Sequence, residues 1–167
     1  SRITYMNNNE DKSKELQSII IESVNRLITE ACKKVGISTE EVYDMTVSGN
    51  TVMHHIFFGI STKYIAFSPF PVSIKNSFDI KARDVGLMVN PAAYVHALPP
   101  IAGFVGSDTV AGILATEIYK TKEKSMLIDI GTNAEIVVGN KDKLSCCSAP
   151  AGPAFEGVRI KFGIKAS

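Results

Sequence analysis

The sequence lacks an excess of charge of either sign, and it lacks a long apolar run. Its 167 residues carry 18 Lys plus Arg against 17 Asp plus Glu, a formal net charge of +1. Nucleic-acid binders normally carry a basic stripe, so we expect no nucleic-acid partner. No apolar run approaches the roughly 20 residues that a membrane span needs, so no membrane partner is expected. Residues 1–14 contain no signal-peptide apolar core, and we expect a cytoplasmic protein.

Cysteine is also scarce, and its spacing excludes several kinds of site. The three cysteines are Cys32, Cys146 and Cys147, and none belongs to a CxxC spacing. An odd count without that spacing predicts neither a disulfide framework nor zinc ligands, and no iron–sulfur ligands are expected in this chain. On a strand, the adjacent Cys146 and Cys147 would point to opposite faces. We interpret the cysteines as small apolar residues in a reducing compartment.

The apolar residues that are present predict alternating strands and helices. The chain is 45% hydrophobic and 21% charged, which is enough to bury a core. Helical periodicity is clearest over 12–35, and Ser38 is placed to cap a turn at 39–41. Segment 61–90, interrupted by prolines, is predicted to be an irregular surface excursion, with a short helix at 82–85. The remaining predicted elements are strands over 42–48, 93–98, 126–129, 135–138 and 144–148, helices over 52–58 and 110–119, and a hairpin turn at 139–142.

The segment DIGTNAE at 129–135 has the residues of a phosphate-binding turn. A buried apolar strand leads to Asp129, and Gly131 lets the backbone approach a ligand because it has no Cβ. The amides of Gly131, Thr132 and Asn133, with the Thr132 hydroxyl, could donate to phosphate oxygens. Asp129 could hold Mg²⁺ directly or through water. A plain β-hairpin with a glycine turn explains the same residues, and the spacing leaves both readings open.

Two further glycine-containing turns each lead into a predicted helix. In GFVGSDTVAG, Gly103 and Gly106 form the turn and Asp108 lies near the helix start. We favour an N-cap for Asp108 over a catalytic role. In SGNTVMHH, Gly49 precedes Asn50 and Thr51 at a strand end that could face a cleft.

The adjacent His54 and His55 on the second of these helices point about 100° apart and are poorly placed to share a metal. We predict one packed and one interfacial histidine. In AGPAFEG at 151–157, Pro153 is well placed to open a helix, and Glu156 is predicted to cap its first turn.

These motifs resemble those of known ATP-binding proteins. DIGTNAEI resembles the phosphate motif of the superfamily that contains actin, the sugar kinases and the heat-shock ATPases. Four segments occur in the same order as in the reductive activators of corrinoid proteins, and this resemblance covers nearly the whole chain. They are GNTVMHH at 49–55, LPPIAGFVGSDTVAGILAT at 98–116, DIGTNAEIVVGN at 129–140 and AGPAFEG at 151–157.

The resemblance implies a fold and a set of ligand-binding residues. The fold would be α/β, with truncated ribonuclease-H-like lobes: residues 1–120 in the first lobe, 125–167 beginning the second, and the polar connector 121–124 between them. The implied cofactor is ATP with Mg²⁺, Asp129 being the metal residue and Asp108 the catalytic residue that orients the attacking water. The implied nucleotide-binding residues are Gly49, Asn50, Thr51, Gly103, Gly106, Gly131, Thr132 and Asn133.

The resemblance also implies a function and a partner. Family members use ATP to help return an inactive cob(II)amide to the cob(I) state, so a corrinoid protein is the expected partner. Their ferredoxin-like domain, first phosphate loop and adenosine-binding part are expected outside this chain. We therefore expect a slow ATPase in the parent polypeptide and no activity in this segment alone. Unpaired sheet edges also predict a dimer or a swapped assembly.

Two alternative functions remain open from the sequence. One is a small-molecule kinase of the same superfamily, although Asn50 has no base character where such a kinase would need a catalytic Asp. The other is a non-catalytic binding or scaffold module that keeps the fold.

Overall fold

The computed structural model describes residues 10–65 and 67–152. The chain forms two compact units, Ser1–Ser107 and Asp108–Ser167. The lobe boundary at 121–124 stays a prediction. In the part of the chain that the structure describes, no helix combines the length and the apolar character of a membrane span. The predicted helix start at Pro153, with Glu156, lies outside the described residues.

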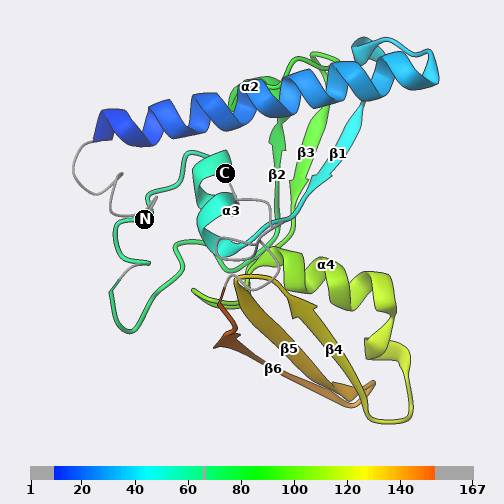
Figure 1. The fold of residues 1–167 in the computed structure, drawn as a ribbon. Helices are drawn as coiled ribbons and strands as arrows, with labels where there is room; N and C mark the ends of the chain where they lie inside the picture. Colours follow the sequence, from blue (N-terminus) through cyan, green and yellow to red (C-terminus); the bar gives the residue numbers. More distant parts are fainter. Residues whose placement is uncertain (1–9, 66, 153–167) are drawn as a thin grey trace, which may run out of the picture. The chain divides into compact units, whose positions relative to one another are not determined.

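The first unit is a small sheet with one long helix (Figure 1). Strand β3 lies in the centre, parallel to β1 and antiparallel to β2, with Asp44 opposite Tyr94 and Phe78 opposite Ala97. The core gathers Ile21 of the helix, Val85 and the fully buried Val95 of β3. The elements are α2 (Glu10–Val35), η1 (Thr39–Glu41), β1 (Asp44–Val47), α3 (Thr51–Phe57), β2 (Phe78–Lys81), η2 (Ala82–Val85) and β3 (Tyr94–Ala97).

Most of the predicted elements in this unit are confirmed, and one strand was missed. Ser38 caps η1 through a capping box with Glu41, as its position predicted. Strand β2 falls in the segment that we expected to be irregular, so that expectation is wrong for 78–81. Its four residues, Phe78–Lys81, alternate between apolar and polar, but the run is too short to be recognised alone, and the strand is held in place by β3.

Helix α2 is fixed to the sheet side of the unit by an apolar stripe and by one polar side chain. Ile20, Val24 and Ile28 pack against the core cluster. The Asn25 side chain donates to Gly86 O (3.0 Å) and accepts from Met88 N (2.8 Å). These two bonds pair the backbone groups of Gly86 and Met88 in the turn after η2, and they tie α2 to that turn.

The second unit is a three-stranded meander with one helix. Its elements are α4 (Ser107–Thr116), η3 (Ile118–Lys120), β4 (Ser125–Ile130), β5 (Asn133–Asn140) and β6 (Lys143–Pro150). Helix α4 begins three residues before the predicted start and ends where Glu117 adopts a left-handed conformation (φ 53°). Strands β4, β5 and β6 pair antiparallel in chain order. The predicted hairpin turn at 139–142 is confirmed, and a Cβ on Gly139 would overlap Lys143 O.

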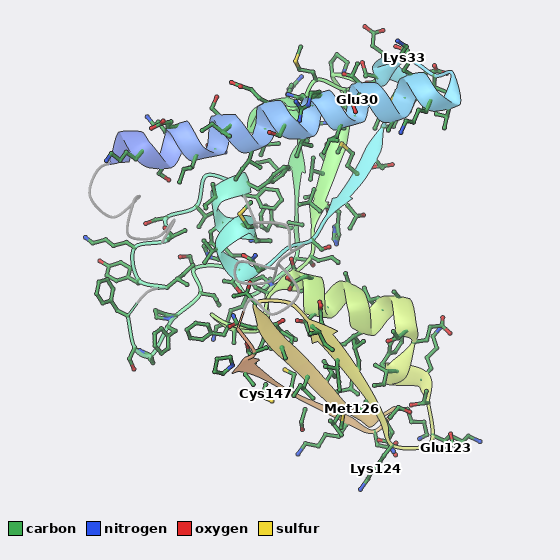
Figure 2. The ribbon with its side chains drawn as sticks, viewed as in Figure 1. Glu30, Lys33, Glu123, Lys124, Met126 and Cys147 are labelled. Carbon is green, nitrogen blue, oxygen red and sulfur yellow. The ribbon has the colours of Figure 1, made fainter. Side chains whose placement is uncertain are left out.

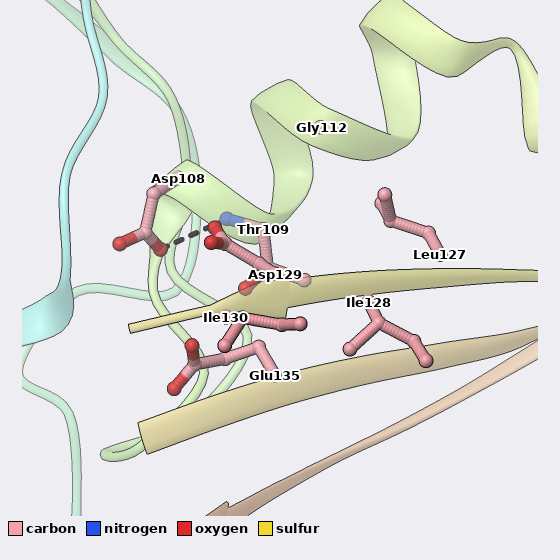
Figure 3. A pocket seen from close by; sticks show the side chains of 8 residues that line it. All are labelled: Asp108, Thr109, Gly112, Leu127, Ile128, Asp129, Ile130 and Glu135. Atoms are coloured by element: carbon pink, nitrogen blue, oxygen red, sulfur yellow. Dashed lines mark hydrogen bonds between the residues drawn. The ribbon is translucent and has the colours of Figure 1, made fainter. Parts of the chain in front are cut away.

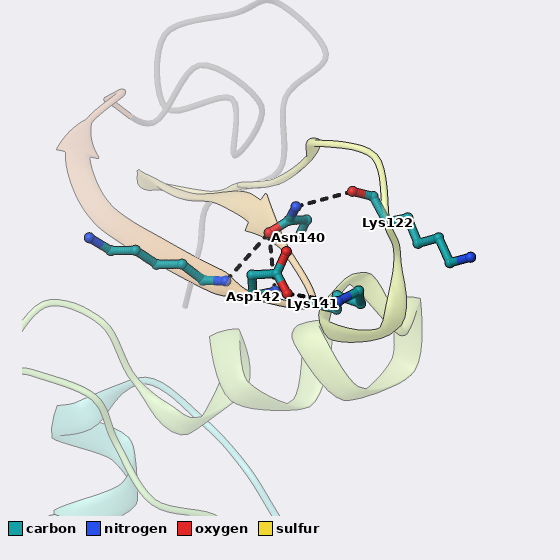
Figure 4. Close-up of polar contacts among 5 residues, drawn as sticks. Lys122, Asn140, Lys141 and Asp142 are labelled. Atoms are coloured by element: carbon teal, nitrogen blue, oxygen red, sulfur yellow. Dashed lines mark hydrogen bonds and ion pairs between the residues drawn. The ribbon is translucent and has the colours of Figure 1, made fainter.

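The segment before β4 is fastened to the turn between β5 and β6 (Figure 4). Asn140 donates to Lys122 O (3.0 Å) and accepts from Asp142 N (3.1 Å). The Lys141 amide donates to Thr121 O (2.8 Å). The polar residues at 121–124 are therefore held against the sheet, which is the opposite of a free linker.

The two faces of this sheet differ in character. Leu127 lies on the face toward α4, where its side chain approaches the Cα of Gly112, and Val137 is fully buried. The other face carries an exposed apolar row from β4, together with Cys147 (Figure 2): Met126, Ile128 and Ile130 are 61%, 48% and 58% exposed. The prediction that Cys146 and Cys147 point to opposite faces is confirmed by their differing burial. Burial, and to a lesser extent Cys147, raises the pKa of Cys146.

Candidate functional site

The second unit contains a pocket of about 270 Å³ between α4 and the ends of β4 and β5 (Figure 3). This volume is well above what one water molecule needs, so the pocket has room for a hydrated cation with phosphate oxygens. Asp129 and Asp108, the predicted metal and catalytic residues, both line it. The lining residues are Asp108, Thr109, Gly112, Leu127, Ile128, Asp129, Ile130 and Glu135.

The pocket is strongly acidic. Asp129 on β4 lies directly opposite Glu135 on β5, so two carboxylates are neighbours across the strand pair. Like charges in this arrangement repel. The Ser148 hydroxyl donates to Glu135 Oε1 (3.0 Å) and holds one of them in place. With Asp108, three carboxylates line the pocket, and none of its described lining residues is Lys, Arg or His.

Asp108 lies inside the first turn of α4 and is not the N-cap of the helix, so the favoured prediction of a cap is wrong. The helix already begins at Ser107, and Asp108 Oδ1 accepts from the Thr109 amide (2.8 Å). A carboxylate in the first turn is still favoured by the helix dipole. Its side chain lies near that of Asp129 at one end of the pocket (Figure 3).

The donor set fits Mg²⁺ better than a softer metal. All the charged groups are oxygen ligands, and Mg²⁺ typically takes one or two carboxylates and keeps several waters. Among residues 10–65 and 67–152, no group of three or more His, Cys, Asp or Glu could hold a metal ion between them, so a cation here would have at most two protein carboxylates and would need further ligands from water or substrate. An open carboxylate pocket of this kind would hold the cation together with substrate oxygens.

The turn at 131–133 is tighter than a preformed phosphate nest. The Gly131 amide donates to Asn133 O (2.8 Å), so this predicted phosphate donor is engaged within the turn. Thr132 O accepts from the amides of Ala151 and Gly152 (3.3 and 2.9 Å). A Cβ on Gly131 would meet Asn133 O only at 3.5 Å, an ordinary contact. The protein itself therefore does not require glycine here, whereas a ligand lying on the turn would.

The other predicted nucleotide residues gather in the first unit. Ser107 is fully buried, and its hydroxyl both accepts from Gly49 N and donates to Gly49 O (3.0 Å each). Asn50 caps α3 by accepting from Met53 N (2.9 Å), and the buried Thr51 hydroxyl donates to Ala102 O (2.7 Å). The side chains of Asn50 and Thr51 thus hold the turn together, and sequence alone did not reveal this.

Gly103 and Gly106 lie in the turn that these bonds hold. Gly106 is buried. A Cβ on Gly103 would lie 2.7 Å from Phe70 O, so only glycine fits there. The Phe70 ring also packs edge-on against Phe104, with 4.8 Å between the ring centroids. Gly103 therefore has a steric role within the first unit.

Both histidines of α3 are buried, so the expectation of an interfacial histidine is wrong. His55 Nδ1 faces Thr51 O (2.7 Å) and therefore carries the proton, while Nε2 accepts from Ser73 N (3.3 Å). Burial and then the neighbouring His55 lower the pKa of His54 to about 4, and the nearby Leu98 backbone offsets part of the shift. Neither ring nitrogen of His54 makes a hydrogen bond of good geometry to a described residue.

Two pocket residues, Thr109 and Glu135, were not singled out from the sequence. Glu135 stands six residues after Asp129 across a tight turn, a spacing that brings it opposite Asp129 once the hairpin register is known. The pairing register of the predicted hairpin could therefore have identified Glu135 from the sequence. Nothing in the sequence marks Thr109.

The fold is that of an α/β protein of the actin and sugar-kinase class. Comparison with known families agrees. Residues 1–121 match the RACo middle region, and residues 123–167 match the C-terminal domain of RACo, the ASKHA domain. The chain belongs to this family, the reductive activators of corrinoid proteins.

Individual relatives are similar along nearly the whole chain. The corrinoid activation enzyme RamQ of Eubacterium limosum is 35% identical over 99% of this chain, and a [Co(II) methylated amine-specific corrinoid protein] reductase of Methanosarcina barkeri is 27% identical over 89%. A solved structure, a reductive activator for corrinoid, iron-sulfur protein, superposes with a TM-score of 0.91 at 37% identity over 99% of the chain. The chain spans 28% of the length of each curated relative and 26% of that structure.

Proposed function

We propose that this chain belongs to an ATP-dependent reductive activator of a corrinoid protein, and that it binds the Mg²⁺ and phosphate end of the nucleotide. The acidic pocket carries this proposal. A triphosphate would be repelled by the carboxylates of Asp108, Asp129 and Glu135, because no described residue that lines the pocket is basic. A divalent cation reverses that repulsion, so the ligand is MgATP and not free ATP.

The residues of the pocket then have separate roles. Asp129 holds the cation directly or through its waters, and the bound Mg²⁺ neutralises charge on the phosphate oxygens. Asp108, at the first turn of α4, orients the attacking water. The turn at 131–133 contacts the phosphates when the Gly131 amide exchanges its bond to Asn133 O for one to the ligand. Such an exchange couples nucleotide binding to the shape of the turn.

Nucleotide binding would act on the partner by shifting a conformational equilibrium. A ligand shifts such an equilibrium only by its different affinity for the two states. ATP would therefore favour the docked state in which the corrinoid protein is reduced from cob(II) to cob(I). The electron comes from outside this chain. The names of the curated relatives support this partner class. We also propose a place in one-carbon metabolism and a cytoplasmic location.

The decisive test measures MgATP hydrolysis by the full-length polypeptide, with and without Asp129→Asn, in the presence of a cob(II)amide protein. We expect turnover and cobalt reduction in the wild type and loss of both in the variant. Turnover that depends on Asp129 but not on cobalt would instead favour a small-molecule kinase. Equal turnover in both proteins would remove Asp129 from the mechanism.

A further inference from the structure

The hydroxyl of Thr109 is buried without a partner in the wall of the acidic pocket. Thr109 is 2% exposed, and among the described residues nothing bonds its Oγ1. It lies in the first turn of α4, and its side chain points toward the strand that carries Asp129 (Figure 3). A buried hydroxyl without a hydrogen bond is destabilising, so its retention in this position needs a reason.

Other helical hydroxyls in this chain avoid that situation. Thr29 donates to Asn25 O (2.9 Å) and Thr116 donates to Gly112 O (2.7 Å), each using the carbonyl four residues earlier. Thr109 stands in the first turn of α4, where the carbonyl four residues earlier, that of Val105, precedes the helix, so this bond is not open to it. Its hydroxyl is left without a partner in the pocket wall, and because the oxygen itself is buried, a ligand reaches it by displacing the groups that cover it.

Among the described residues that line the pocket, Thr109 is also the one whose side chain can donate a hydrogen bond. The other lining side chains are apolar, absent in glycine, or carboxylates, and ionised carboxylates only accept. Phosphate oxygens only accept as well. Whatever neutralising cation is present, the Thr109 hydroxyl is the side-chain group in this pocket that can bond directly to a phosphate oxygen.

We propose that Thr109 is a phosphate-binding residue of this pocket, whose hydroxyl donates to an oxygen of the Mg²⁺-bound phosphate. This assignment rests on the proposed function, because it needs a phosphate ligand beside Asp129. It gives the helix a direct contact with the ligand, next to Asp108. It also gives a role to a buried hydroxyl that has no partner among the described residues.

The test compares Thr109→Val, which keeps the shape and removes the hydroxyl, with Thr109→Ser, which keeps the hydroxyl. The full-length polypeptide is titrated with MgATP, and its thermal unfolding is measured without nucleotide. For Thr109→Val we expect a Kd at least about tenfold higher, the loss of one hydrogen bond to a charged group. We also expect a higher Tm without nucleotide, because an unbonded buried hydroxyl is gone. Thr109→Ser should keep most of the affinity.

The control is Thr116→Val on the same helix, whose exposed hydroxyl is bonded within the helix, and it should leave the affinity unchanged. If the wild type binds MgATP and Thr109→Val binds it equally well, the assignment is wrong while the proposed function stands. A lower Tm without nucleotide in Thr109→Val would show that the hydroxyl has a structural partner, which also contradicts the assignment. If the wild type binds no MgATP, the proposed function and the assignment both fail.

Discussion

Asp129 and Glu135 face each other across β4 and β5, so the tight turn between these strands brings two like charges together at the mouth of one pocket. Directly opposed like charges destabilise a strand pair by about 0.2–1 kcal/mol. A bound cation removes this repulsion. The two carboxylates therefore lower the stability of the protein without a cation but favour the binding of one, and both effects can be measured.

Neutralising either carboxylate should stabilise the ligand-free protein and weaken its response to Mg²⁺. We expect Asp129→Asn and Glu135→Gln each to raise the unfolding free energy by about 0.2–1 kcal/mol without a divalent ion. Both should reduce the stabilisation that MgATP gives in the full-length polypeptide, in thermal melts with and without MgATP. A fall in stability without the ion would show that the two carboxylates do not repel, for example because Ser148 anchors Glu135.

The buried His54 should make the protein less stable in mild acid. Its pKa is about 4 in the folded chain against 6.5 for an ordinary histidine. As the pH falls below 6.5, His54 becomes protonated in the unfolded chain, whereas in the folded chain it stays neutral until about pH 4. Stability should thus fall between these values, by up to about 3 kcal/mol.

The measurement for His54 is urea unfolding at several pH values, for the wild type and for His54→Leu. The variant should show a flatter dependence between pH 6.5 and 4, with a residual slope from His55, whose pKa burial also lowers. An unchanged slope in His54→Leu would mean that another group governs the acid response.

Gly103 and Gly49 should respond differently to the same substitution. In Gly103→Ala the new Cβ would lie 2.7 Å from Phe70 O, so we expect a loss of about 1–3 kcal/mol of stability. In Gly49→Ala the nearest atom is the Cβ of Met53 at 3.8 Å, and stability should change by less than about 0.5 kcal/mol.

Denaturant unfolding checks both glycine variants, and MgATP titration then tests Gly49 separately. A normally stable Gly49→Ala protein with weakened nucleotide binding would support the predicted ligand contact. Full binding would make Gly49 a structural residue only.

The exposed apolar row of β4 should drive self-association of this chain. Met126, Ile128 and Ile130 present neighbouring apolar side chains on a sheet face, and such surfaces tend to associate. We expect a dimer by light scattering at high concentration and a monomer for Ile128→Lys. Leu27→Lys on α2, a site 58% exposed in the other unit, is the control and should remain associated. A monomeric wild type would contradict the prediction of a homodimer.

Local patterns predicted most of the elements, because the signals for them lie within a few residues. Three features depend only on neighbours in the sequence: the apolar stripe of α2, the capping box of Ser38 and the turn before Lys143. The four-residue β2 could not be found this way, since its identity as a strand depends on β3 more than ten residues later.

The candidate site was predicted in part for a related reason. Asp129 and Asp108 stand in recognisable motifs, and the structure brings both into one pocket. Glu135 requires the register of the hairpin, and Thr109 requires knowing which hydroxyls lack a partner. The roles of Asn50 and Thr51 in holding their turn depend on contacts with Met53 and with Ala102, the latter 51 residues away.

The order of the strands has a consequence for how quickly each unit can fold. In the second unit β4, β5 and β6 pair with their immediate successors, so each pairing closes only a short loop. In the first unit, β1 pairs with β3, whose residues follow fifty positions later in the sequence, as in the pair Asp44 and Tyr94. This pairing therefore closes a long loop. Loop-closure entropy makes such distant pairings slow. We therefore expect the pocket-bearing meander to form its strand pairings before the sheet that precedes it in the chain.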